Sequence, residues 1–286
     1  VPKAAKMASL GQKVQNKLLG VVPSVWKKRM QSPIFAGSGP KMGYTNLYES
    51  LRLHRGSVFA PREVTPGMPC VLYFPGCGGS LFYDRIGLAA IMLLLHTGHA
   101  VAVPPRHLCC GYPLLAAGMD TEYEDNMAQN RQYLASMLRN LIKQGFDVRY
   151  LATACGSCRD SLARMKLNEQ FPQLEQKDVS QIVLLQHEGM EAPVAPGTNV
   201  LYHAACHCEW AGVPTLKGQA QLTGALEQLC KVKVSTIPGC CGESGMGAVT
   251  SPTIYNLLRA RKKERLAQAF EPQPQTGACY AGPILV

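Results

Sequence analysis

A cysteine pattern that occurs twice is the feature of this 286-residue chain that most limits how it can fold. In the first copy, 31 residues separate Cys77 from Cys109-Cys110-Gly111, and 44 residues separate Cys110 from the group Cys155-Gly156-Ser157-Cys158. In the second copy, 33 residues separate Cys206 from Cys240-Cys241-Gly242, and 37 separate Cys241 from Cys279. One CC or CxxC pair would be weak evidence for a site, whereas two copies in register are strong evidence.

The same order of elements surrounds the cysteines in both copies. Short β-rich runs at 71–74 and 200–203 lead to the first cysteine, and runs at 100–103 and 232–237 lead to the CCG triplet. Helical stretches are expected at 81–96 and 125–143 in the first copy and at 216–229 and 252–270 in the second. A third apolar run then reaches Cys155 or Cys279. Alternating strands and helices predict an α/β fold: two pseudo-repeated βαβ cysteine-rich halves, each with a parallel sheet.

This arrangement places every motif cysteine at the end of a predicted strand. In open α/β sheets, sites form at the carboxyl ends of the strands, so each half is expected to gather its cysteines at one edge of its sheet. Nearby glycines would let the backbone approach sulfur closely. We therefore expect two converging thiolate sets, in preference to inert cysteines scattered through a core.

Converging thiolates suit iron–sulfur clusters and also zinc. Twelve cysteines are too few for a small secreted disulfide scaffold, and we expect no secretory signal, which favours a reducing compartment. Structural zinc sites favour compact CxxC pairs, whereas most of these ligands lie more than 30 residues apart. The spacing favours an iron–sulfur centre, and a zinc-stabilised interaction module remains an alternative.

The pattern resembles the tandem CCG (cysteine-rich) domains of heterodisulfide reductase. The same domains occur in the iron–sulfur subunits of glycolate oxidase, anaerobic glycerol-3-phosphate dehydrogenase and D-lactate dehydrogenase or lactate-utilisation proteins. The resemblance covers residues 69–286 and implies one or two [4Fe–4S] clusters, cubane or non-cubane. The candidate ligands that it implies are Cys77, Cys109, Cys110, Cys155, Cys158, Cys206, Cys240, Cys241 and Cys279.

The second copy departs from the family pattern. Gly282 stands where the last cysteine is expected, so a non-cubane centre in that copy is in doubt, although four cysteines still complete a thiolate site. Cys208 is a weaker candidate ligand. Cys70 and Cys230 lie outside the register and are expected in the core. Three histidines beside motif cysteines are expected to form hydrogen bonds or to pack, in preference to binding iron: His107, His203 and His207.

The positive charge of the chain is concentrated at its beginning. Residues 1–48 hold eight of the 29 Lys and Arg residues and no acidic residue. We expect residues 1–65 to form a basic arm with an amphipathic helix, 69–190 to form the first CCG domain, and 195–286 to form the second, with an incomplete last motif. The arm is expected to meet an acidic protein, a membrane surface or solvent, and no nucleic acid. The ends of the sequence suggest a fragment or a processed subunit.

The sequence also lacks several motifs. It has no Rossmann GxGxxG after a strand and no P-loop, so FAD is expected only on a partner domain or subunit. The resemblance implies electron transfer from that flavoprotein, a 2-hydroxyacid dehydrogenase acting on lactate or glycolate, to a quinone or another carrier. We expect a cytoplasmic protein, free or peripheral to the membrane. The first alternative to this relay is disulfide reduction of the heterodisulfide reductase kind, and the zinc-stabilised interaction module comes after it.

Overall fold

The computed structural model describes residues 10, 45–53, 57–186, 195, 197–203, 215–237, 251–270 and 284–285. These residues fall into two compact units: the first contains the described residues from 45 to 186, and the second contains those from 195 onward. Each unit is built on its own sheet. The predicted α/β class with two repeated halves is confirmed.

The first unit contains a five-stranded sheet in the order β1-β3-β2-β4-β5. Strands β2 (Pro69–Tyr73), β3 (Ala100–Val103), β4 (Asp147–Thr153) and β5 (Glu175–Asp178) are parallel. β1 (Ser57–Phe59) joins the edge antiparallel to β3. The sequence predicts these three residues as part of the N-terminal arm, because so short a strand carries no periodicity of its own.

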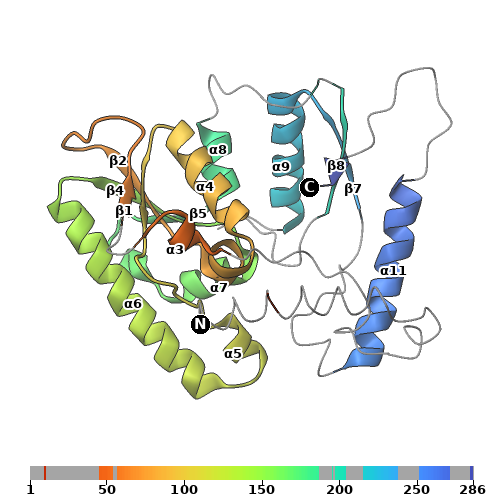
Figure 1. Cartoon of the computed structure of the whole chain (residues 1–286), viewed down its shortest axis with the longest axis horizontal. Helices are drawn as coiled ribbons and strands as arrows, with labels where there is room; N and C mark the ends of the chain where they lie inside the picture. Colours follow the sequence, from red (N-terminus) through yellow and green to blue (C-terminus); the bar gives the residue numbers. More distant parts are fainter. Residues whose placement is uncertain are drawn as a thin grey trace. The chain divides into compact units, whose positions relative to one another are not determined.

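Helices cover both faces of this sheet, as a buried parallel sheet requires. Side chains of Cys70, Leu72 and Phe74 pack with residues of α6 (Asp120–Lys143) and α7 (Gly156–Arg164) in one core cluster. α4 (Asp84–His96) and α8 (Val179–Leu185) lie on the other side of the sheet from α6 (Figure 1). The described part of this unit also contains short helices such as α3 (Leu47–Ser50), α5 (Tyr112–Ala116) and the 3-10 turn η2 (Leu167–Glu169).

A π-helical turn occupies the start of the first predicted helix. The sequence predicts a helix over 81–96, and the chain instead forms η1 (Gly78–Phe82), with i to i+5 hydrogen bonding, before α4 begins at Asp84. π-turns are rare and frequently occur at functional sites. This one directly follows Cys77.

The second unit repeats the first with fewer described elements. Its sheet has the order β7-β6-β8, with β6 (Asn199–Tyr202), β7 (Lys233–Thr236) and β8 (Ile284–Leu285) all parallel. This is the same spatial order as β3-β2-β4 in the first unit. Its described helices are α9 (Thr215–Cys230) and α11 (Pro252–Phe270).

The last strand described in the second unit is β8. Ile284 and Leu285 are apolar β-formers, and they pair with Val200 and Leu201 of β6. The apolar run that the sequence predicts before Cys279 lies outside the described residues. Among the helices that the structure describes, none combines the length and the apolarity needed to cross a membrane.

Candidate metal centre

Three loops bring the first set of cysteines to one edge of the sheet. Cys77 follows β2, Cys109 and Cys110 follow β3, and Cys155 follows β4. These three strands are neighbours and run parallel, so their carboxyl ends lie side by side. The fold therefore provides the convergence that the sequence pattern predicts.

The five cysteine side chains form one continuous cluster. The Sγ atoms of Cys77 and Cys109 lie 3.8 Å apart. Side-chain hydrogen bonds continue the cluster between Cys109 and Cys110, between Cys110 and Cys158, and between Cys158 and Cys155. Cys110 and Cys158 are buried and the other three are half-buried; all five are free thiols.

Two of these sulfurs are poised as thiolates. Hydrogen bonds from the side chains of Cys110, Cys77 and His107 lower the pKa of Cys109 far below the usual thiol range. A hydrogen bond from Cys158, helped by backbone N–H groups at the start of α7, lowers the pKa of Cys155 to about 6.

The other three sulfurs hold their protons. Cys110 donates to Cys109, and this raises the pKa of Cys110 to about 11. The pKa of Cys77 also rises, because Cys77 donates to Cys109, and that of Cys158 rises because it donates to Cys110 and Cys155. Metal ligation by these three cysteines would therefore release protons.

Gly76 makes room for one of the sulfurs. A Cβ at this position would lie 2.6 Å from the Sγ of Cys158, and the backbone has a φ of +61°, which L side chains rarely adopt. Both constraints select glycine. The expectation that glycines allow backbone to approach sulfur closely is confirmed here.

Helix α6 holds the CCG loop through two asparagines. Asn126 Nδ2 and Asn130 Nδ2 both donate to the carbonyl oxygen of Cys109, at 3.0 and 2.7 Å. The same helix packs Tyr123 against Gly111, which has a φ of +81° and where a Cβ would lie 3.0 Å from the ring. The orientation of Cys109 therefore depends on α6.

We expect Asn130→Ala to lower the free energy of unfolding by about 1–2 kcal/mol, because the buried amide is lost and one donor remains on the Cys109 carbonyl. Asn130→Asp should cost more, since it replaces the donor with an oxygen that faces the carbonyl. Urea unfolding of the metal-free protein measures both. Gln129→Ala, on the exposed side of the same helix, is the control and should change stability by less than about 0.5 kcal/mol. Equal effects of all three changes would contradict this role.

His107 lies beside the cluster, as the sequence predicts, and a hydroxyl orients it. Its Nε2 is 3.6 Å from Cys77 Sγ, and its Nδ1 is 3.1 Å from Ser80 Oγ. The Ser80 hydroxyl also donates to the carbonyl oxygen of Gly76, so the side chain that contacts the His107 ring is itself held by the loop that precedes Cys77.

Sequence reasoning missed several residues around the cluster. Tyr48, in the segment predicted as an arm, hydrogen-bonds the side chain of Ser80, and burial raises its pKa to about 12. The hydroxyl of Tyr73 is buried without a hydrogen-bond partner in the described part of the chain, and it interacts electrostatically with Cys155 and Cys158. Serine, asparagine and tyrosine are common, and no spacing in the sequence singled these out.

Of the remaining candidates from the sequence, the structure describes Cys70, Cys230 and His203. Cys70 is fully buried in the core, as predicted, and Cys230 is half-buried at the end of α9. His203, after β6, accepts a hydrogen bond at Nδ1 from Nζ of Lys262 on α11, at 2.9 Å. The other second-copy candidates lie outside the described residues: Cys206, His207, Cys208, Cys240, Cys241, Cys279 and Gly282.

The residues of the first copy fit an iron–sulfur group by their chemistry. They provide five soft sulfur donors, two of them anionic near neutral pH, with a glycine that leaves space beside Cys158. The unused donor of Tyr73 lies in the same electrostatic environment. Over the described ranges, no group of three or more His, Cys, Asp or Glu side chains is arranged to hold a single metal ion.

The first unit is thus a parallel α/β domain that gathers cysteines from three successive loops, one of which carries the CCG triplet. The family description "Cysteine-rich domain" (CCG) matches residues 71–163 and 200–279, and the chain belongs to this family. Membership confirms the resemblance inferred from the sequence, together with its classification as an iron–sulfur, metal-binding protein of the oxidoreductase class.

Two curated relatives have the same name. Lactate utilization protein A of an Exiguobacterium species is 23% identical over 219 residues, covering 71% of this chain and 82% of the relative. Lactate utilization protein A of Geobacillus thermodenitrificans is 25% identical over 214 residues, covering 69% and 82%. No solved structure matches the chain.

Proposed function

We propose that this chain is the iron–sulfur electron-transfer subunit, or module, of a flavin-dependent 2-hydroxyacid dehydrogenase system that acts on lactate or a similar acid. The observation that carries the proposal is the continuous cluster of five cysteines after three neighbouring parallel strands. Such a thiolate set suits a cluster that takes up and passes on single electrons.

The protein's own part would be to hold and insulate that group. Cys77, Cys109, Cys110, Cys155 and Cys158 are the proposed ligands of a [4Fe–4S]-type centre. Asn126 and Asn130 would fix the CCG loop. Burial of two of the five cysteines would limit access of water to the centre.

A second centre is proposed for the second copy, with Cys206, Cys240, Cys241 and Cys279 as ligands. The support is indirect: the order of its sheet, β7-β6-β8, repeats that of the first unit. The family match also extends over 200–279, which contains all four cysteines.

The substrate class and partners rest on the relatives. Both are named for lactate utilization, and this sequence contains no flavin-binding or nucleotide-binding motif of its own. The proposed partners are therefore a flavoprotein dehydrogenase as electron donor and a quinone or another carrier as acceptor. The basic arm is a candidate for docking to an acidic or membrane surface.

The test begins with iron, acid-labile sulfide and zinc per chain after anaerobic purification. About four irons with matching sulfide support one cluster, and about eight support two. Near-stoichiometric zinc without sulfide would replace the proposal with an interaction module. The next step mixes the brown protein with lactate, with and without a flavin-dependent lactate dehydrogenase. Bleaching of the brown colour by lactate only in the presence of the flavoprotein supports the relay. Direct oxidation of the reduced protein by an organic disulfide would favour disulfide reduction.

A further inference from the structure

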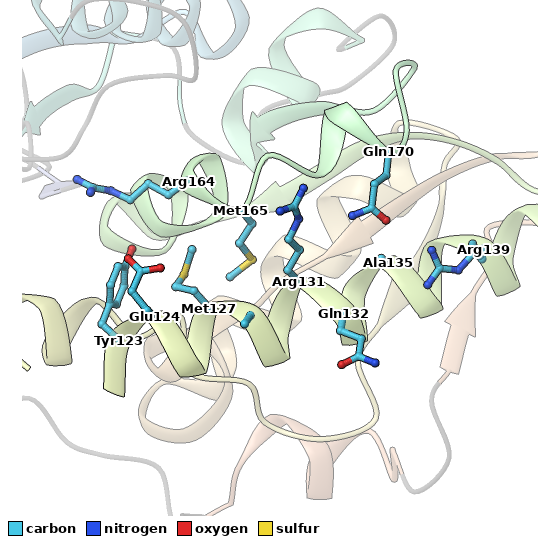
Figure 2. Close-up of a pocket in the computed structure, with 11 residues that line it drawn as sticks. Tyr123, Glu124, Met127, Arg131, Gln132, Ala135, Arg139, Arg164, Met165 and Gln170 are labelled. Atoms are coloured by element: carbon cyan, nitrogen blue, oxygen red, sulfur yellow. The ribbon is translucent and has the colours of Figure 1, made fainter. Parts of the chain in front are cut away.

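The cysteine cluster is supported from both sides of the sheet. On one side, Asn126 and Asn130 of α6 donate to the carbonyl oxygen of Cys109, and neighbouring residues of this helix line a cavity of about 640 Å³ (Figure 2). On the other side lies the segment 45–53, which we call the strap. It precedes the residues that the family description matches, and it packs against α4 and against η1, the turn that follows Cys77.

The strap has a defined position against α4. Leu47 is fully buried there. The hydroxyls of Thr45 and Ser50 both donate to Oδ2 of Asp84, the first residue of α4, at 3.3 and 3.1 Å. A buried leucine and two hydrogen bonds therefore hold the strap in place, and Tyr48 lies between them in the chain.

Ser80 connects the strap to the cysteines. It is fully buried in η1, and its hydroxyl contacts three polar groups: the side chain of Tyr48, the carbonyl oxygen of Gly76 and Nδ1 of His107. His107 in turn places its Nε2 3.6 Å from Cys77 Sγ. These contacts form an unbroken chain from the strap to one sulfur of the cluster.

Tyr48 completes the hydrogen bonding of Ser80. A serine hydroxyl has one proton and two acceptor sites, so three partners use its whole capacity and leave it a single orientation. If the Tyr48 hydroxyl is removed, Ser80 is free to turn, and it holds the His107 ring less firmly.

The contact between His107 and Cys77 gives this orientation a redox consequence. When Cys77 ligates iron, its sulfur has no proton to donate, so the contact is then a hydrogen bond to sulfur. Hydrogen bonds to ligating sulfurs help to set the potential of iron–sulfur centres. They draw negative charge away from the centre, and they therefore favour its reduction.

We propose that the strap is a functional part of the metal centre and that Tyr48 is its positioning residue. Through Ser80 and His107, Tyr48 fixes the orientation of Cys77 and raises the reduction potential of the centre. The redox consequence rests on the proposed iron–sulfur function. The positioning of Cys77 applies equally to the metal-free chain.

The first test follows the alkylation of Cys77 by iodoacetamide in the reduced, metal-free full chain, with peptide mass spectrometry to locate the modified cysteine. Tyr48→Phe keeps the ring and removes only the hydroxyl. We expect the initial rate at Cys77 to rise about three- to tenfold, the equivalent of one hydrogen bond, because a loosely held His107 ring shields the half-buried sulfur less.

A double-mutant cycle distinguishes positioning from a general loosening of the fold. Ser80→Ala should raise the rate at Cys77 at least as much as Tyr48→Phe does. In the Ser80→Ala background, Tyr48→Phe should have no further effect, because the contact through which it acts is already lost.

The second test is the midpoint potential of the centre in anaerobically purified protein. Tyr48→Phe should lower it by the equivalent of about a three- to tenfold change in the equilibrium constant for one electron, where tenfold corresponds to about 59 mV. Tyr150→Phe is the matched control. Tyr150 is also half-buried, but its ring contacts His99, which precedes β3 at the end opposite the CCG loop. It should change neither the potential nor the rate.

The two measurements separate the positioning role from the iron–sulfur function. If the protein contains no iron and sulfide, the proposed function fails, while the alkylation rates still decide whether Tyr48 positions Cys77. The positioning role is overturned if Tyr48→Phe leaves the rate at Cys77 unchanged, or if its effect and that of Ser80→Ala are additive. The redox consequence is overturned if iron-containing Tyr48→Phe protein keeps the original potential or has a higher one, or if Tyr150→Phe shifts the potential equally.

Discussion

Replacing Cys109 with serine is expected to remove the whole metal centre of the first copy, a loss of about four irons per chain with their sulfide. Cys109 contacts both Cys77 and Cys110 and has the most strongly lowered pKa of the five thiols. A serine hydroxyl is a harder ligand and keeps its proton at neutral pH. Iron and sulfide analysis with the visible spectrum, on anaerobically purified protein, measures the loss.

Cys230→Ser is the matched control for this change. Cys230 is also a free, half-buried cysteine, but it lies at the end of α9 and outside the repeated pattern. It should leave the iron content unchanged. Retention of full iron and sulfide by the Cys109 variant would show that the five-cysteine cluster is not the metal centre.

The second large effect is expected from Gly76→Ala. The added methyl group would lie 2.6 Å from Cys158 Sγ at a φ of +61°, so strain and overpacking act together. We expect the free energy of unfolding of the metal-free protein to fall by about 3 kcal/mol. Because Cys158 must move to relieve the clash, the iron content should fall as well.

Gly67→Ala separates the two causes. Gly67 also has a positive φ, +79°, but a Cβ there would have no atom within 4 Å. This variant should lose only about 1 kcal/mol, from backbone strain alone, and should keep its iron. If the two alanine variants have the same stability and the same iron content, the close approach of Gly76 to sulfur has no structural importance.

The sequence predicts the elements that have clear periodicity or punctuation. The strand Ala100–Val103 and the helix Pro252–Phe270 have the predicted bounds. Helix α6 begins at Asp120, five residues before its predicted start, because the polar first turn carries no apolar spacing. The π-turn Gly78–Phe82 was not predictable, since its hydrogen-bond register leaves no mark in a hydrophobic pattern.

The candidate site, like the fold, is only partly predictable from the sequence. Convergence of Cys77, Cys109 and Cys155 follows from strand order, which the repeated βαβ pattern indicates. The contacts that orient the cluster do not follow, because they join residues far apart in sequence: Ser80 with His107, and Asn130 with Cys109. Serine, histidine and asparagine are equally frequent elsewhere in proteins. Only tertiary packing distinguishes the ones that contact the cluster.

The antiparallel strand Ser57–Phe59 determines where the chain can be shortened. It covers the edge of β3, the strand that leads to the CCG loop. A truncated protein that starts at residue 69, where the repeat begins, would expose the backbone N–H and C=O groups of β3 to any neighbouring molecule. Unprotected edges of this kind promote intermolecular strand addition and aggregation. Recombinant forms of the first unit should therefore begin before Tyr48, which also keeps the tyrosine that contacts Ser80.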